Sequence, residues 1–251
     1  MKSNRIIMIL SLVLVLAVNF LANTLPINGV TTGEVSDQFP ILFVPAGYVF
    51  SIWGLIYLAL FGFAVYSVTR RGLANKAIDT ITWWFVASNV FNAAWIFLWH
   101  FQLFLLTLIP IFGLLISLLG IYLKLKIGLE NRSQIEKLLV AAPFSIYLGW
   151  ATVAVVANVS QALYSVGWRG EPLSMPFWTV LMLGIASVLG ILMIFLRKEV
   201  AYSLVLTWAF IGIWVKHGGT PIVAISALSL AIILAALTLI KGASNLKSKS
   251  A

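Results

Sequence analysis

Long apolar stretches alternate with short polar segments along the whole chain. Eight stretches contain no Asp, Glu, Lys or Arg, and they are residues 6–23, 45–68, 80–99, 103–123, 138–164, 176–196, 200–215 and 221–240. A helix needs about 20 apolar residues to cross a hydrocarbon core roughly 30 Å thick, and a segment in lipid must satisfy its own backbone hydrogen bonds. The pattern therefore predicts an all-α, polytopic integral membrane bundle of eight transmembrane helices.

Two of these stretches leave an alternative open. Residues 200–215 comprise only 16 residues, although Lys198 and Lys216 at their ends are able to extend toward the membrane surface. Residues 1–24 have the basic start and apolar core of a signal peptide, but the apolar run is longer than usual and no small-residue cleavage site follows it. We interpret both stretches as spans.

The positive residues test this assignment, because its boundaries used no information on the sign of charge. With eight spans, 14 of the 16 Lys and Arg residues lie on one side, and only Arg169 and Lys216 lie on the other. Lysine and arginine are retained in cytoplasmic loops. The distribution predicts that both termini are cytoplasmic and that the chain is a multi-pass protein of the cell membrane.

Composition excludes a soluble domain. The chain is 62% hydrophobic and 9% charged, whereas soluble domains are about 45–50% apolar and about 25% charged. A net charge of +9 would suggest nucleic acid for a soluble protein. Here the bases face an anionic leaflet, so we expect membrane lipid as a partner and no nucleic acid. The absence of cysteine removes disulfides and thiol chemistry.

No ionisable acid or base lies inside a predicted span, which disfavours proton pumps and ion-coupled carriers. The polar groups at depth are amides instead. Asn92, Trp95 and Trp99 recur at i, i+3 and i+7 and share one face of a helix, and Asn158 and Gln161 are three residues apart. Two interpretations stay open: the amides join helices to one another, or they contact a ligand.

Ten tryptophans are many for 251 residues. Those near predicted span ends suit the membrane interface, and they are Trp83, Trp99, Trp168, Trp178 and Trp214. Those at greater depth suit either packing or the face of a planar ligand, and they are Trp53, Trp95, Trp150 and Trp208. The polar external segment Leu25 to Val44 is rich in turn formers, which indicates either a lid over a cavity or a plain connector.

Three motifs, taken in order, resemble the TspO/MBR family of tryptophan-rich sensory proteins. The first is PAGYVFSIWGLIY at residues 45–57, which is similar to the family pattern PPGWxFxxVWxxxY, with Tyr48 in the place of a tryptophan. The second is NAAWIFL at residues 92–98. The third is PFSIYLGWATVAVVAN at residues 143–158, followed by GWRG at residues 167–170.

The resemblance implies a five-helix, ligand-binding bundle over residues 1–170, and residues 171–251 then form three additional transmembrane helices and a polar tail. It also implies a pocket that binds a tetrapyrrole or a sterol-like molecule, with a sensory, regulatory or transport role. We expect aromatic walls and two polar contacts from the following residues: Tyr48, Phe50, Trp53, Tyr57, Asn92, Trp95, Trp150 and Asn158.

Other functions stay open. A permease for a small neutral or amphipathic solute and a structural subunit of a membrane complex are the alternatives, and a homodimer is a further expectation. We expect no enzymatic activity, because no activated nucleophile, carboxylate pair or metal cluster has a suitable spacing. We expect no resident cofactor and no metal.

Overall fold

A computed structural model describes residues 3–25 and 27–250, with side chains up to residue 242. The described chain is helical and contains no strand. Its elements are α1 (Ser3–Thr24), η1 (Ile27–Gly29), α2 (Thr32–Ser36), η2 (Gly47–Ser51), α3 (Ile52–Val68), α4 (Arg70–Ala74), α5 (Lys76–Thr80), α6 (Thr82–His100), α7 (Phe104–Lys124), α8 (Gln134–Glu136), η3 (Lys137–Ala141), α9 (Ala142–Ser165), α10 (Met175–Leu196), α11 (Ala201–Lys216) and α12 (Pro221–Ser250). The predicted all-α class is confirmed.

Six of the described helical segments are long and apolar enough to cross a membrane. They are α1, η2 with α3, α7, the continuous run α8–η3–α9, α10 and the first part of α12. Helix α6 has 19 residues, but Asn89 and Asn92 lower its hydropathy, and α11 has only 16 residues. The chain is therefore a helical membrane protein, whereas eight spans and two cytoplasmic termini stay predictions.

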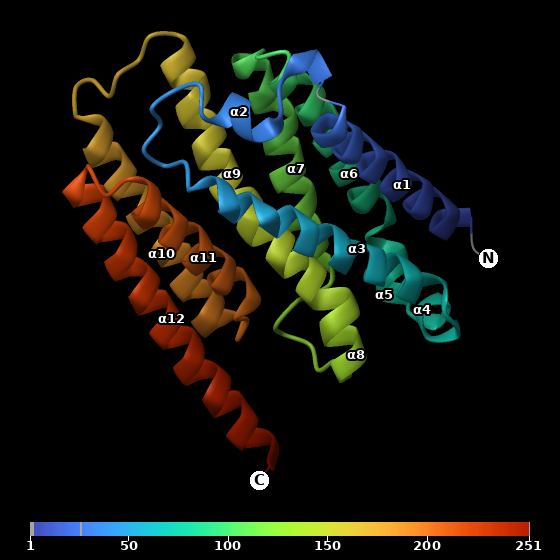
Figure 1. Cartoon of the computed structure of the whole chain (residues 1–251). Coiled ribbons are helices and arrows are strands. Elements are labelled where there is room, and N and C mark those ends of the chain that lie inside the picture. The colour runs from blue at the N-terminus through green and yellow to red at the C-terminus, as the bar shows by residue number, and fades with distance from the viewer. Residues whose placement is uncertain (1–2, 26, 251) are drawn as a thin grey trace.

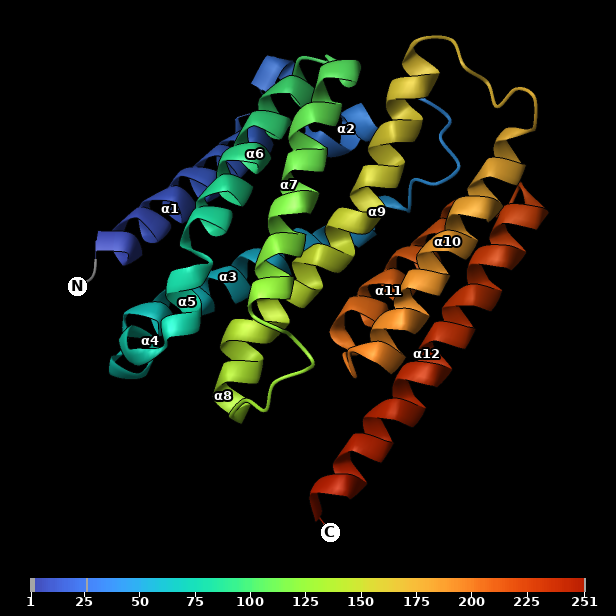
Figure 2. The same cartoon turned by 180° about the vertical axis from the view of Figure 1, so that it is seen from behind.

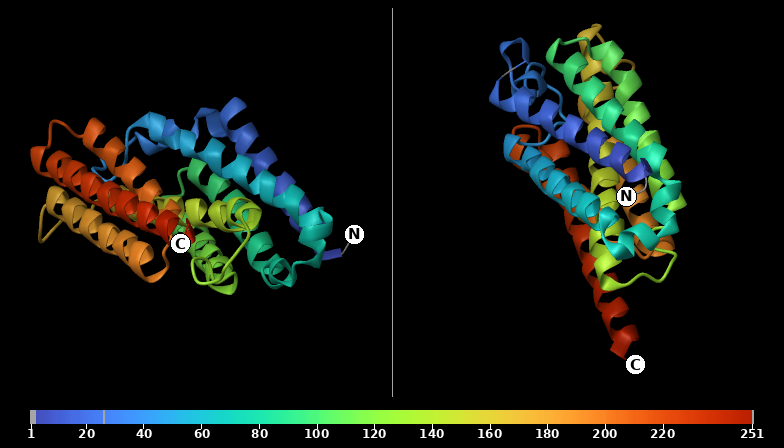
Figure 3. Two further views of the ribbon diagram at one scale, coloured as in Figure 1. Left: turned by 90° about the horizontal axis from the view of Figure 1, so that it is seen from below. Right: turned by 90° about the vertical axis from the view of Figure 1, so that its right-hand side faces the viewer.

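The long helices form two neighbouring groups (Figures 1 and 2). Helix α6 packs between α1 and α7, and α7 packs on α9, while α3 lies across α1 and α9. Helices α10, α11 and α12 pack on one another and meet the first group chiefly through α11 against α9. The same division is visible when the molecule is seen from below (Figure 3, left).

The surface of the bundle has the polarity expected for a protein in lipid. On α3 the large side chains of Leu55, Leu58, Phe61 and Val65 are each more than half exposed. The interior holds aromatic rings and buried amide side chains, which are those of Asn19, Asn89, Asn92, Asn158 and Gln161. Because acyl chains offer polar side chains no partner, the polar groups turn inward and the apolar ones outward.

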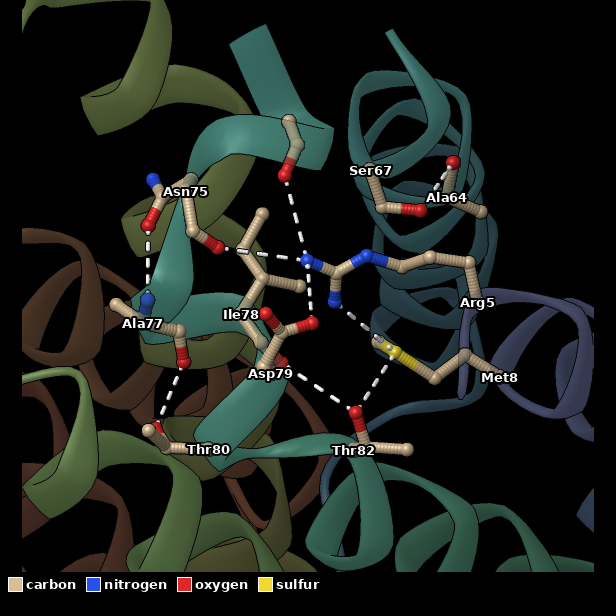
Figure 4. A network of polar contacts seen from close by, with 11 residues as sticks. Arg5, Met8, Ala64, Ser67, Asn75, Ala77, Ile78, Asp79, Thr80 and Thr82 are labelled. Carbon is tan, nitrogen blue, oxygen red and sulfur yellow. Dashed lines mark hydrogen bonds and ion pairs between the residues drawn. The ribbon is translucent and has the colours of Figure 1, made fainter. Parts of the chain in front are cut away.

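A buried ion pair lies at the end of the bundle where α1 begins and where α4 and α5 lie, which we call the basic end (Figures 1 and 4). The Arg5 guanidinium is 0% exposed and lies 3.1 Å from a carboxylate oxygen of Asp79. It also donates to the backbone oxygens of Gly72 and Asn75 at 3.3 and 3.4 Å. The sequence pattern treated Arg5 only as a charge that orients the first span, and the structure shows that it also attaches α1 to α4 and α5.

Helix α11 joins the last three helices to the first group. A Cβ added at Gly149 in α9 would lie 3.0 Å from the backbone oxygen of Tyr202, so the two helices approach closely because Gly149 has no side chain. Glu199 accepts from the backbone N–H groups of Ala201 and Tyr202 at the start of α11. Burial of the Glu199 carboxyl between the two groups raises its pKa above the usual range.

Candidate functional site

Aromatic side chains from α3 and α9 meet in the interior of the first group. Trp53 is at the centre: its ring stacks on Tyr57 with centroids 5.5 Å apart and contacts the edge-on rings of Tyr147 and Trp150 at 5.8 and 6.1 Å. Phe50 packs edge-on against Trp150 at 5.7 Å. Edge-to-face and offset geometry at these separations is the favourable arrangement for aromatic pairs.

A second aromatic pair comes from α6. The rings of Trp95 and Trp99 stack with centroids 5.2 Å apart, as their spacing of four residues permits. Both are buried and line one cavity with Phe50, Trp53 and Trp150. We call the group Phe50, Trp53, Tyr57, Trp95, Trp99 and Trp150 the aromatic chamber.

Two small cavities lie within the aromatic chamber. One has a volume of about 40 Å³ and is bounded by α6, α9, and Thr32 and Ser36 of the external segment. The other has a volume of about 230 Å³ and extends toward Asn19 and Asn23 of α1. Thr32, Phe50 and Trp53 line both cavities, so these three side chains form the wall between them.

The two predicted polar residues are already hydrogen-bonded to other helices. Asn92 accepts from Asn19 Nδ2 at 2.7 Å and donates to the Tyr147 hydroxyl at 2.8 Å, which connects α6 to α1 and α9. Asn158 accepts from Trp95 Nε1 and donates to Thr107 Oγ1, both at 2.6 Å, which connects α9 to α6 and α7. These contacts support the interpretation that the amides join helices.

Two buried polar groups in the chamber have no hydrogen-bond partner among the described residues, the Tyr57 hydroxyl and the Trp150 indole N–H. Trp150 is 2% exposed, and its indole N–H makes no hydrogen bond within the described residues. A buried donor without an acceptor destabilises a protein by about 1–3 kcal/mol. The neighbouring indole N–H groups are satisfied, since Trp95 donates to Asn158 and Trp99 donates to the backbone oxygen of Thr32 at 3.1 Å.

Seven of the eight predicted site residues lie together in or directly beside the chamber. The exception is Tyr48, which is 46% exposed and packs edge-on against Trp208 of α11 at 5.3 Å. Two further residues of the site were not predicted. Thr32 lines both cavities, and Tyr147 packs against Trp53 and accepts a hydrogen bond from Asn92. The belt interpretation of Trp99 is wrong, because its ring is 5% exposed and belongs to the same helix face as Asn92 and Trp95.

The segment 25–44 between α1 and α3, which is predicted to be external, forms one wall of the chamber. Its α2 begins with a capping box in which Thr31 and Glu34 bond each other, and these bonds lower the pKa of the Glu34 carboxyl. On the inner side, Gln161 Nε2 donates to the backbone oxygen of Val35 at 3.0 Å. The segment is thus anchored on helices α6 and α9, which line the chamber.

Helix α11 holds the other half of the same segment. Lys216 forms an ion pair with Asp37, and a ring nitrogen of His217 lies 2.9 Å from the backbone oxygen of Val44. Burial lowers the pKa of His217 below its ordinary value. Helix α11 therefore contributes to the position of the segment that covers the chamber.

A larger cavity lies between the two groups of helices. It has a volume of about 400 Å³ and lies between α9 and α10 beneath the external segment. Ile41 and Phe43 of that segment, Val159 of α9, and Trp178 of α10 are among its lining residues. Its walls are almost entirely apolar, so it continues the lipid-like interior rather than presenting a polar site.

The described helices, their apolar outer faces and the buried amides define the chain as an α-helical integral membrane protein. Within that class the family is also shown: the sequence pattern of the family described as TSPO-like protein matches residues 5–240, and the chain belongs to this family. The match includes α10, α11 and α12 up to residue 240. No curated protein and no solved structure matches the chain.

Proposed function

We propose that the protein binds a planar, largely apolar ligand, of the size and shape of a tetrapyrrole or a sterol, in the aromatic chamber, and that it senses, regulates or moves this ligand in the cell membrane. The observation that carries the proposal is the buried, unpartnered N–H of Trp150 beside a cavity walled by Phe50 and Trp53. A ligand with an acceptor atom would complete this hydrogen bond, and the ring faces would contact its plane.

Binding of such a ligand requires the chamber to open. Sites for drug-sized ligands have volumes of about 300–1,000 Å³, and the cavities of the chamber measure about 40 and 230 Å³. Phe50 and Trp53 separate the two cavities, so rotation of these side chains would join them. The external segment covers the same place through Thr32, and its displacement would supply the remaining volume.

Intrinsic tryptophan fluorescence tests the proposal directly. The full chain, purified in mild detergent, is titrated with protoporphyrin IX, and saturable quenching is expected. Trp150→Phe keeps the ring but removes the N–H, so its dissociation constant is expected to rise about fivefold to tenfold, the effect of losing one hydrogen bond of about 1–1.5 kcal/mol.

Trp83→Phe is the matched control, since Trp83 is 65% exposed and lies outside the chamber. Its dissociation constant should equal that of the unmodified protein. Titrations in which Trp150→Phe and Trp83→Phe behave alike would exclude the chamber as the site. An absence both of saturable quenching by protoporphyrin IX and of any saturable change in tryptophan emission with cholesterol would contradict the ligand class.

A permease and a receptor differ in whether the ligand crosses the bilayer. Proteoliposomes that contain the full chain are loaded with ligand, and its release is followed over time. A receptor shows binding without protein-dependent release, whereas a permease shows release that Trp150→Phe slows. The two roles share the same site, so this experiment decides the role and leaves the site assignment unchanged.

A further inference from the structure

A second concave site lies at the basic end of the first group, away from the aromatic chamber. It is a groove of about 620 Å³ between the end of α3 and the run α8–η3. We call it the basic groove, and it is lined by Phe61, Gly62, Val65, Tyr66, Thr69, Arg70, Arg71, Ile135 and Leu139. Seven of these residues carry no charge and two are arginines, and no acidic residue lines the groove.

The two arginines differ from others in the described part of the chain. Arg5 pairs with Asp79, and Arg132 pairs with Glu130. Arg70 and Arg71 form no ion pair with a carboxylate of the described residues, and both are exposed at the mouth of the groove. Adjacent positive charges repel each other, so an anion between them would be stabilised by both.

The nearest acidic side chains are engaged elsewhere. Glu136 of α8 accepts from Asn75 Nδ2 at 2.9 Å and from the Ser133 hydroxyl at 3.0 Å, as the cap of its own helix. Asp79 pairs with Arg5. Arg70 and Arg71 are the charged residues among those that line the basic groove, so its lining is net positive.

The walls of the groove are suited to a hydrocarbon chain. Phe61 and Val65 project from the outer face of α3 and are 57% and 51% exposed. The opposite wall includes Leu139, which lies in the π-helical turn Lys137–Ala141. A Cβ added at Gly62 would lie 3.2 Å from Leu139 Cδ2, so the absence of a side chain at Gly62 allows the two walls to meet at the inner end.

We propose that the basic groove binds an anionic phospholipid of the phosphatidylglycerol type. The phosphate lies between the guanidinium groups of Arg70 and Arg71, which match phosphate oxygens with paired N–H donors. One acyl chain lies along Phe61, Val65 and Leu139. Basic pockets between transmembrane helices at the cytoplasmic surface are typical sites for anionic headgroups, and this end carries most of the basic residues.

A zwitterionic lipid fits less well for an electrostatic reason. Its phosphate would meet the arginines, but its quaternary ammonium would lie close to the same two positive charges. Inorganic phosphate would satisfy the arginines but would leave the apolar walls without a partner. The combination of both features selects a lipid that is anionic overall.

Native mass spectrometry of the full chain in mild detergent measures this preference. The protein is titrated with dioleoyl phosphatidylglycerol and, separately, with dioleoyl phosphatidylcholine, and the dissociation constant of the first bound lipid is determined. Tighter binding of phosphatidylglycerol is expected. In Arg70→Gln with Arg71→Gln this dissociation constant should rise about 30-fold, since each basic residue near a membrane surface contributes about a fivefold effect.

The matched control is Lys124→Gln with Lys198→Gln, which removes the same charge from exposed positions outside the basic groove. It should bind phosphatidylglycerol within about twofold of the unmodified protein. A loss equal to that of the arginine variant would reduce the effect to net charge and overturn the proposal. Equal affinity for the two lipids in the unmodified protein would also overturn it.

A second variant tests the apolar wall without changing charge. Val65→Trp adds a large side chain to an exposed position that lines the groove. It should raise the dissociation constant of phosphatidylglycerol at least fivefold and leave the dissociation constant of protoporphyrin IX unchanged. Competition by 10 mM inorganic phosphate together with unaltered binding in Val65→Trp would show a phosphate site instead. Because neither arginine belongs to the aromatic chamber, this proposal and the proposed function fail independently.

Discussion

Replacement of Asn158 by leucine separates a structural amide from a ligand-binding amide. Asn158 is 2% exposed and bridges α9 to α6 and α7 through two bonds of 2.6 Å. Leucine has a similar volume, so the main change is the loss of the amide. Thr107 keeps its own bond to the backbone oxygen of Phe104, whereas the Trp95 N–H loses its acceptor.

The expected destabilisation follows from this one orphaned donor. A buried unsatisfied donor costs about 1–3 kcal/mol. Bonds between transmembrane helices are worth about 0.6 kcal/mol on average and about 1.7 at most, because a chain unfolded in the membrane also finds partners. We therefore expect Asn158→Leu to lower the free energy of unfolding by about 1–1.5 kcal/mol.

Unfolding by SDS in mixed micelles, followed by far-ultraviolet circular dichroism, measures this free energy. Asn23→Leu is the control: Asn23 is exposed and bonds only to a backbone oxygen of its own helix, so its replacement should change stability by less than about 0.5 kcal/mol. Adding Trp95→Phe to Asn158→Leu removes both partners. The double variant should then lose less stability than the sum of the two single variants.

Two outcomes would refute the reasoning. Strictly additive losses would mean that the Trp95 to Asn158 bond contributes nothing to stability. A variant Asn158→Leu as stable as the unmodified protein, but with weaker protoporphyrin quenching, would mean that the amide contacts the ligand. The first outcome concerns the bond and the second concerns the role of the residue.

Two further predictions concern ionisable groups. Asp79→Asn removes the anion that lies 3.1 Å from the fully buried Arg5 guanidinium. The free energy of unfolding should fall by about 2–3 kcal/mol, less than the about 3–5 kcal/mol for a fully buried pair, because Asp79 is 28% exposed. Adding Arg5→Met should restore part of this loss in the same SDS titration, and a further loss would contradict the prediction. Burial lowers the pKa of His217, so the unfolded chain takes up a proton at about pH 6.5 before the folded protein does. Stability is then complete above that pH and falls as the pH drops through the lowered value. Cleavage of the external segment after Glu34 by a glutamate-specific protease, normalised at each pH to cleavage of a model peptide, should accelerate from pH 7.5 to pH 5.5. His217→Gln should flatten this dependence, and an unchanged pH profile in the variant would exclude His217 as the cause.

The aromatic chamber has the chemistry of a ligand site, but its cavities are smaller than a drug-sized ligand requires. The rings and the free Trp150 N–H provide the chemistry of a ligand site, but the cavities are small because Phe50 and Trp53 fill the space between them. Opening therefore requires Phe50 and Trp53 to move apart, and a ligand that fills the joined cavities would then cover both rings.

The helical class and the membrane location follow from the sequence alone, because an apolar run of about 20 residues in lipid satisfies its own backbone hydrogen bonds as a helix. The spacing of Asn92, Trp95 and Trp99 likewise places them on one face before any coordinates are known. The family motifs at residues 45–57, 92–98 and 143–158 identify the helices that meet in the chamber. All of these features depend on the order and spacing of residues within one helix, which the sequence pattern shows directly.

Tertiary packing decided the rest. Tyr48 lies in a motif with Trp53, yet the turn of η2 directs it to Trp208 of α11, more than 150 residues away in the chain. Whether Asn92 and Asn158 join helices depends on Tyr147, Trp95 and Thr107 arriving within hydrogen-bond distance, and Arg5 is buried only because α4 and α5 fold against α1. Periodicity reports which face of a helix a side chain occupies, but the partner on that face is chosen by contacts between distant segments.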